Sequence, residues 1–253
     1  MNLEAFLQRI HFAGDRTPGP SSLAALQLSF LLSVPFENYD IHWGRPLSLE
    51  LDDLEDKIVR RRRGGVCYES NVLFRAALEQ LGYEVRYLDA RMGMSNDVGF
   101  GPACDHMVLL VSLDREYLVD VGNGQSCRVP LPLDADRLHE SEGINYRLSW
   151  QDGMRALMTR RGEGNWEARF LFSNGQRELP EFYPMLEHVQ TSPESHFTQH
   201  RLATRALVNG RVTLRDGKLI VQENGKTTRQ DAQDEAEEMK WLKDWFGIQA
   251  PTG

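Results

Sequence analysis

The period of the apolar residues changes from helical to strand-like near residue 83, and that change limits the folds that this chain can adopt. Before it, apolar residues recur at helical spacing, as in "LEAFLQRI". After it, strand-like runs separated by turn residues predict short strands. Six such runs follow one another: "YEVRYLDARM", "HMVLLVSL", "EYLVDVG", "YRLSWQD", "MRALMTRR" and "WEARFLFS". Helices therefore come first, and an antiparallel sheet follows as a barrel or a sandwich.

The first part of the chain predicts four helices. One covers the N-terminal "MNLEAFLQRI", and a second follows the break "TPGPSS" and stops at Pro35. A third lies in "LSLELDDLEDKIVRRR". A fourth runs from about residue 67 to residue 81, where Gly82 ends it.

The C-terminal part predicts a small mixed unit. "SHFTQHRL" is typical of a short helix, and the turn dipeptides Asn209-Gly210, Asp216-Gly217 and Asn224-Gly225 predict a β-meander. The acidic "QDAQDEAEEMKWLKDWFG" predicts an amphipathic closing helix. The order of helices, strands and a mixed piece indicates an α+β protein, with segments at about 1–85, 86–190 and 191–253.

Composition indicates which cellular compartment and which kinds of partner to expect. A net charge of -8 argues against a general nucleic-acid surface. Three cysteines, an odd and sparse count, do not form a disulfide framework, so a reducing compartment is expected. The N-terminus reads as an amphipathic helix rather than a signal peptide, and no run approaches the ~18 apolar residues of a membrane span. We expect a cytoplasmic protein without membrane or nucleic-acid partners; the oligomeric state stays open.

Cys67 is the candidate nucleophile. It follows Gly64 and Gly65, which let the backbone turn tightly or approach another group closely, and it opens the fourth helix. A thiol in a first helical turn faces unpaired N–H groups and the positive end of the helix dipole, which favour the thiolate. The alternative is a packed free cysteine beside a solvated run of arginines at residues 60–63.

His106 and Asp120 are candidate partners of that thiol, provided that the hairpin between them has the right length. A two-residue turn at residues 114–115 would place the two side chains on opposite faces. A three-residue connection, which pairs residue 112 with residue 116, makes Asp120 a diagonal neighbour of His106 on the same face, at roughly 7–8 Å between backbones. The Cys–His–Asp triad therefore requires an odd-length or bulged hairpin.

Such a triad has defined chemistry. The histidine takes the thiol proton, the carboxylate orients the imidazole, and N–H groups at the helix start are oxyanion donors. These residues alone indicate thiol acyl transfer or hydrolysis without choosing between them. A zinc site of Cys67, Cys104, His106 and Cys127 is disfavoured because no paired cysteine spacing supports it, so no metal is expected. The "GNGQS" turn lacks the frame of a phosphate-binding loop.

The sequence resembles the arylamine N-acetyltransferases in five motifs that occur in the same order. These are "VPFEN" (34–38), "RGGVCYE" (63–69), "HMVLLV" (106–111), "VDVGNG" (119–124) and "SHF" (195–197). The resemblance implies an N-terminal helical bundle, a central antiparallel β-barrel and a C-terminal α/β lid around a Cys-His-Asp core like that of cysteine proteases and transglutaminases. It also implies ping-pong acetyl transfer from acetyl-CoA, a co-substrate rather than a tightly bound cofactor, to an arylamine, arylhydrazine or N-hydroxyarylamine.

The resemblance also assigns roles outside the triad. Glu37 and Asn38 would brace Arg63, which is a structural task. Substrate would contact Phe36 in the acceptor pocket, together with a set formed by Val66, Pro102, Ala103, Asn123 and Gly124.

Two positions depart from the family pattern. Asn123 stands where many members have an aromatic residue, which exchanges stacking for hydrogen bonding. Asp105 precedes His106 where a small or neutral residue is common, and its charge would raise the pKa of the histidine if it faced the site. Two alternatives therefore stay open: a related amide synthase or a thioester or amide hydrolase that uses another acyl donor, and an inactive ligand-binding scaffold.

Overall fold

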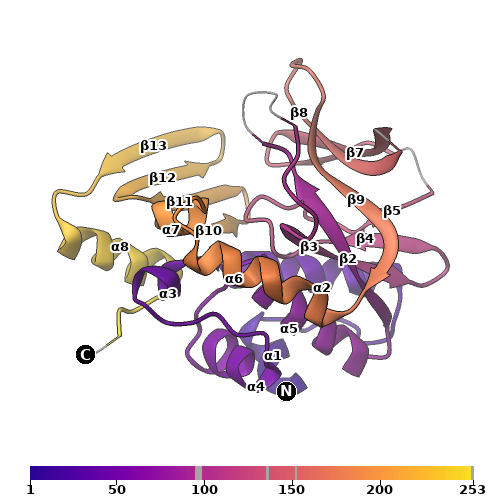
Figure 1. Cartoon of the computed structure of the whole chain (residues 1–253), viewed down its shortest axis with the longest axis horizontal. Helices are drawn as coiled ribbons and strands as arrows, with labels where there is room; N and C mark the ends of the chain where they lie inside the picture. The colour runs from indigo at the N-terminus through magenta and orange to yellow at the C-terminus, as the bar shows by residue number, and fades with distance from the viewer. Residues whose placement is uncertain (95–98, 135–136, 152, 252–253) are drawn as a thin grey trace.

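The chain folds into a mixed α/β structure with two antiparallel sheets (Figure 1). The computed structural model describes residues 1–94, 99–134, 137–151 and 153–251. Asp152, the last residue of the predicted strand "YRLSWQD", lies outside them. Within the described ranges, no helix combines the length and the apolar character that crossing a bilayer requires.

The N-terminal helices are α1 (Leu3–Arg9), α2 (Pro20–Ser33), α3 (Tyr39–His42), α4 (Leu51–Leu54), the π-helical η1 (Glu55–Arg60) and α5 (Cys67–Gln80). The four predicted N-terminal helices are present, the third as α4 and η1 together, and a short helix, α3, was not predicted. Gly82 adopts a φ of 92°, which an L side chain disfavours, and it turns the chain out of α5 into the first long strand.

The six predicted strands form one eight-stranded sheet together with two short strands that the sequence pattern missed. The sheet contains β2 (Glu84–Met92), β3 (His106–Ser112), β4 (Glu116–Val119), β5 (Leu131–Pro132), β6 (His139–Ser141), β7 (Ile144–Gln151), β8 (Met154–Arg161) and β9 (Glu167–Arg177). Its order is β5-β4-β3-β2-β9-β8-β7-β6, so β5 and β6 are its two edges. The predicted barrel is thus a curled, open half-barrel.

The second sheet covers the other end of the molecule (Figure 1). It consists of β1 (Phe36–Glu37), β10 (Leu202–Leu207), β11 (Gly210–Arg215), β12 (Lys218–Glu223) and β13 (Lys226–Asp231), in that order. The predicted meander is confirmed, although its first turn is shifted by one residue because Leu207 pairs with Gly210. The closing helix is α8 (Glu235–Phe246).

The link between the two sheets carries η2 (Leu179–Phe182), α6 (Tyr183–Thr191) and the predicted short helix α7 (His196–Gln199). The two-residue strand β1 was not predicted, and it ties the "VPFEN" segment to β10 through Phe36–Thr204 and Glu37–Ala203 pairs. The N-terminal and C-terminal parts of the chain therefore share a sheet.

Strand β3 is buried on both faces, which explains its continuous apolar run. Met107, Leu109 and Val111 belong to the core shared with the helices. Val108 and Leu110 belong to a second core inside the half-barrel. The strand that begins with His106 is thereby fixed between two packed layers.

Candidate active site

Cys67 is the first residue of α5 and is 3% exposed. The turn before it is tightly packed: a Cβ on Gly65 would lie 2.8 Å from Glu69 Oε2, and a Cβ on Gly64 would collide with the Pro35 carbonyl. Neither glycine has a positive φ. The glycines are therefore required for close approach of the backbone rather than for an unusual conformation.

The β3–β4 hairpin has the odd-length connection that a triad requires. Ser112 pairs with Glu116, so three residues separate the strands. His106 Nε2 lies 3.0 Å from Asp120 Oδ2, and His106 lines the same cavity as Cys67. The structure thus brings the three predicted residues together.

Asn71 links the parts of this cluster, and sequence reasoning missed it. Its Nδ2 donates to the Cys67 carbonyl at 3.2 Å, to the Met107 carbonyl at 2.9 Å and to Asp120 Oδ1 at 3.4 Å. Its Oδ1 accepts the Val121 N–H at 3.3 Å. Its position four residues after the cysteine, on the same helix face, was the available signal.

Electrostatics favour the charged forms of the histidine and the carboxylate. Burial lowers the pKa of His106, but the charge and hydrogen bond of Asp120, together with Cys67, outweigh it and raise the pKa to about 10. Burial raises the pKa of Asp120, but the charge and hydrogen bond of His106 and the Gly122 N–H, 2.8 Å from Oδ1, hold it below its usual value. These contacts favour the imidazolium form of His106 beside the thiol.

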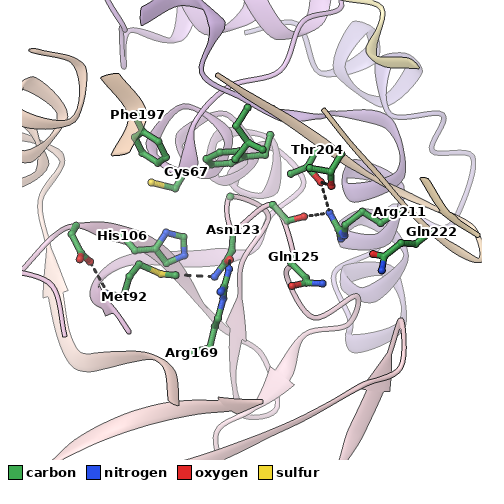
Figure 2. A pocket seen from close by; sticks show the side chains of 16 residues that line it. Cys67, Met92, His106, Asn123, Gln125, Arg169, Phe197, Thr204, Arg211 and Gln222 are labelled. Atoms are coloured by element: carbon green, nitrogen blue, oxygen red, sulfur yellow. Dashed lines mark hydrogen bonds between the residues drawn. The ribbon is translucent and has the colours of Figure 1, made fainter. Parts of the chain in front are cut away.

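The thiol opens into a cavity of about 370 Å³, within the size range of small-molecule sites. Figure 2 shows Cys67, His106 and Phe197 around one end of it. Phe36 and Phe197, whose rings are 5.9 Å apart, supply an apolar wall. The polar wall contains Asn123, Gln125, Arg169, Thr204, Arg211, Thr213 and Gln222.

The cavity separates the predicted substrate-binding residues into two groups. Phe36, Asn123 and Gly124 line it. Val66 is fully buried and does not line it, and Pro102 and Ala103 are exposed outside its wall, so the structure does not place these three at the cavity.

Asp105 lines the cavity and accepts the Met92 N–H at 2.9 Å. Burial raises the pKa of this carboxyl to about 6. Asp120 and Cys67 are the leading groups that raise the pKa of His106. The charge of Asp105 is therefore not a leading cause of the raised pKa of His106, contrary to the expectation from the sequence.

Arg63 is braced as predicted by Glu37, but its second partner is a different residue. Arg63 Nη2 lies 2.7 Å from Glu37 Oε1, and Nη1 lies 2.7 Å from Asp40 Oδ1. Asn38 instead donates to the carbonyl of His200 at 2.8 Å and accepts the Leu202 N–H at 2.8 Å. The expectation that Asn38 braces Arg63 is wrong, because its amide holds the link to β10.

The two remaining cysteines, Cys104 and Cys127, are buried free thiols. Burial raises the pKa of both, and that of Cys127 to about 11. In the ranges that the structure describes, no three His, Cys, Asp or Glu side chains are arranged to hold a metal ion. The chemistry of Cys104 and Cys127 thus differs from that of Cys67, which has a basic partner.

Comparison with known proteins identifies the family. The N-acetyltransferase family model matches residues 21–252. An arylamine N-acetyltransferase of Mycolicibacterium smegmatis is 33% identical over 98% of this chain and 92% of its own. An arylamine N-acetyltransferase / N-hydroxyarylamine O-acetyltransferase of Salmonella typhimurium is 31% identical over 82% of this chain and 74% of its own.

Solved structures agree with that result. The structure of Mycobacterium marinum arylamine N-acetyltransferase in complex with CoA has a TM-score of 0.90, with 31% identity, over 98% of this chain and 93% of that one. Together with the family model and the two relatives, this similarity extends over nearly the whole chain, the Cys67 cavity included. The chain belongs to the arylamine N-acetyltransferase family.

Proposed function

We propose that this chain transfers an acetyl group from acetyl-CoA to an arylamine, arylhydrazine or N-hydroxyarylamine, in two half-reactions that share an acetyl-Cys67 intermediate. The observation that carries the proposal is a cavity lined by both Cys67 and His106, whose Nε2 is 3.0 Å from the buried carboxylate of Asp120. Family membership supports acetyl-CoA as the donor.

In the first half-reaction Cys67 is acylated. The cationic imidazole of His106 stabilises the thiolate, which attacks the thioester carbonyl of acetyl-CoA. The new S–C bond forms as the C–S bond to CoA breaks, and His106 donates its proton to the departing CoA sulfur. First-turn N–H groups of α5 are the candidate donors to the oxyanion.

In the second half-reaction the acceptor takes the acetyl group. The neutral amine attacks the acetyl-Cys67 carbonyl, and its N–C bond replaces the S–C bond. His106, now neutral, accepts the amine proton, and Asp120 stabilises the imidazolium that forms. The products are the amide and the thiolate–imidazolium pair that began the cycle.

The surroundings of the cavity suit both substrates. Its Phe36–Phe197 wall offers stacking to an aromatic acceptor. A second cavity of about 270 Å³, which shares Gln125 and Arg169 with the first, is lined by Arg160 and Arg161. Those guanidinium groups are suited to the phosphates of CoA, and we place its nucleotide end there.

A matrix of acyl-CoA donors and acceptors, with an aniline, a hydrazine and an N-hydroxyarylamine, tests the proposal. We expect amide or ester formation that Cys67→Ala abolishes and that Cys127→Ala, which removes a buried thiol without a basic partner, retains. Rapid turnover of acetyl-CoA in water without amine would instead support the hydrolase. A scaffold without activity would show no turnover and a Cys67 reactivity towards iodoacetamide no higher than that of a free cysteine.

A further inference from the structure

A buried ion cluster joins the half-barrel to the second sheet. Its centre is Glu142, in the two-residue turn between β6 and β7 that Ser141 and Ile144 close by pairing with each other. Arg211 Nε lies 2.9 Å from Glu142 Oε2, and its Nη2 lies 2.8 Å from Oε1. Arg128 Nη2 lies 2.9 Å from the same Oε1. All three side chains are at most 15% exposed, so the cluster is largely withdrawn from solvent.

Glu142 has a backbone conformation that glutamate disfavours. Its φ is 57° and that of Gly143 is 71°, in a hairpin turn of the kind that prefers asparagine, aspartate or glycine. A left-handed residue other than glycine costs about 1 kcal/mol or more. Within the described residues, Glu142 is the one carboxylate in salt-bridge range of Arg128 and Arg211. Its ion pairs therefore offset the strain of the turn, and without them two buried cations would lack a counter-charge.

Arg211 connects this cluster to the turn that follows Asp120. Its Nη1 donates to the Gly124 carbonyl and, at 3.2 Å, to Thr204 Oγ1 (Figure 2). Gly124 has a φ of 54°, and a Cβ there would lie 2.9 Å from the Thr204 side chain, so the turn packs tightly against β10. The second sheet thus holds the turn both by a hydrogen bond from a charged group and by direct contact.

The other end of this turn is bound to the catalytic helix. The Val121 N–H donates to Asn71 Oδ1 at 3.3 Å, and the Gly122 N–H donates to Asp120 Oδ1 at 2.8 Å. A Cβ on Gly122 would lie 2.6 Å from Cys67 Cα, so the turn touches the nucleophile's own backbone. Because the turn is held at both ends, a displacement at the second sheet is passed on to Asp120 and Cys67.

We propose that Glu142 is a positioning residue for the acylation of Cys67. Through Arg211 it fixes the Gly124 carbonyl, and with it the turn that places Asp120. Glu142 is not among the described residues that line the catalytic cavity, so it acts on the reacting atoms through Arg211 and the turn. This inference rests on the proposed function, because its effect is on the rate at which Cys67 takes the acetyl group.

The test measures acylation of Cys67 in single turnovers with two donors, acetyl-CoA and p-nitrophenyl acetate, which carries an acetyl group without a nucleotide. For Glu142→Gln we expect the rate at saturating acetyl-CoA to fall roughly 10- to 100-fold, the loss that a displacement of about 1 Å near the reacting groups causes. The half-saturating concentration of acetyl-CoA should change less than about threefold. The rate constant with p-nitrophenyl acetate should fall by the same factor as the saturated rate, because positioning does not depend on how the donor binds.

The matched control is Glu140→Gln. It removes an exposed carboxylate from the neighbouring strand β6, and this carboxylate makes no ion pair within the described ranges. We expect it to leave both rates unchanged. Arg128→Gln is a second control, because it releases the β10–β11 turn, whose carbonyls Arg128 binds, and spares the link from Glu142 to Arg211. It should lower the melting temperature and change the acylation rate less than about threefold.

Arg211→Met decides the question if Glu142→Gln fails to fold. In that variant Glu142 keeps its pair with Arg128, so the buried charges stay balanced, while the hydrogen bond to the Gly124 carbonyl is lost. We expect a loss of the same size as for Glu142→Gln. Arg211→Lys, which can still donate to that carbonyl, should recover part of the rate. Combining Glu142→Gln with Arg211→Met should cost less than about threefold beyond either change alone, since both break one link.

Three results would overturn the inference. A folded Glu142→Gln or Arg211→Met whose acylation stays within threefold of the wild-type rate would leave the cluster a purely structural role. Losses that multiply in the double variant would show that the two side chains act independently. A loss with acetyl-CoA that is absent with p-nitrophenyl acetate would assign the cluster to donor binding. If the wild type itself takes no acetyl group from either donor, the proposed function fails instead, so the two failures are distinguishable.

Discussion

Replacing Lys57 by methionine removes one cation from a buried charge network at the start of α5, the helix that begins with Cys67. Lys57 Nζ lies 2.8 Å from Glu69 Oε1 and 2.8 Å from Asp40 Oδ2. Glu69 Oε2 in turn accepts the Val66 N–H at 3.0 Å, directly before Cys67. Methionine fills a similar volume without a charge, so the change tests the ion pairs rather than the packing.

The structure gives both the size of the effect and its sign. Breaking a buried ion pair from one side costs about 3–5 kcal/mol of unfolding free energy. Burial raises the pKa of Glu69, and the charge of Lys57 opposes that rise. Without Lys57 the folded pKa of Glu69 moves further above its unfolded value. In the variant, the contribution of Glu69 to stability is then complete at low pH. It is lost, by about 1.4 kcal/mol per pH unit, as the pH rises from the unfolded pKa of Glu69 to its folded pKa.

Urea unfolding of the wild type and Lys57→Met at pH 5, 6, 7 and 8 measures this. We expect a deficit that is smallest at pH 5 and grows to about 3–5 kcal/mol at pH 8. The control is Lys240→Met, whose partner Asp244 is 2.6 Å away on the surface of α8; it should stay within about 0.5 kcal/mol at every pH. A deficit for Lys57→Met as small as the control's, or one independent of pH, would refute the reasoning.

Three further predictions concern the site itself. Gly122→Ala places a Cβ 2.6 Å from Cys67 Cα, so we expect about 1–3 kcal/mol of destabilisation in urea and a loss of acetylation. The control is Gly175→Ala, whose Cβ would be 3.8 Å from its nearest neighbour and which should leave stability and acetylation unchanged. Asp105→Asn removes a carboxyl whose pKa burial raises to about 6, so the variant should gain stability over the wild type at pH 8 and not at pH 4; an equal difference at both would contradict this. Asp120→Asn should lower kcat roughly 10³- to 10⁴-fold, and a fall below tenfold would exclude its role as orienter.

The sequence predicted the parts of the site that depend on local pattern. The helix start at Cys67 follows from Gly64, Gly65 and the apolar spacing beyond. The approach of His106 to Asp120 follows from the count of residues between two strands, once the hairpin is given a three-residue connection, and that register is present. The roles of the triad and the division at about residues 85 and 190 stay predictions.

The residues that sequence reasoning missed come from distant elements. Arg169 reaches the cavity only because β9 pairs with β2, and Arg211 only because β1 and β10 bring the second sheet beside the turn of Gly124. Pro102 and Ala103, which the family resemblance assigned to the substrate-binding set, lie in a loop whose direction the sequence does not fix. The opening of the barrel likewise depends on the two short edge strands, which are too brief to show a period.

Intact-protein mass spectrometry after incubation with acetyl-CoA alone tests the central claim most directly. If Cys67 is the acyl carrier, the wild-type chain gains the mass of one acetyl group, peptide mapping places it on Cys67, and an added arylamine removes it. Cys67→Ala gains nothing. An unmodified wild-type chain, or an acetyl group at another residue that the amine does not remove, would contradict the account.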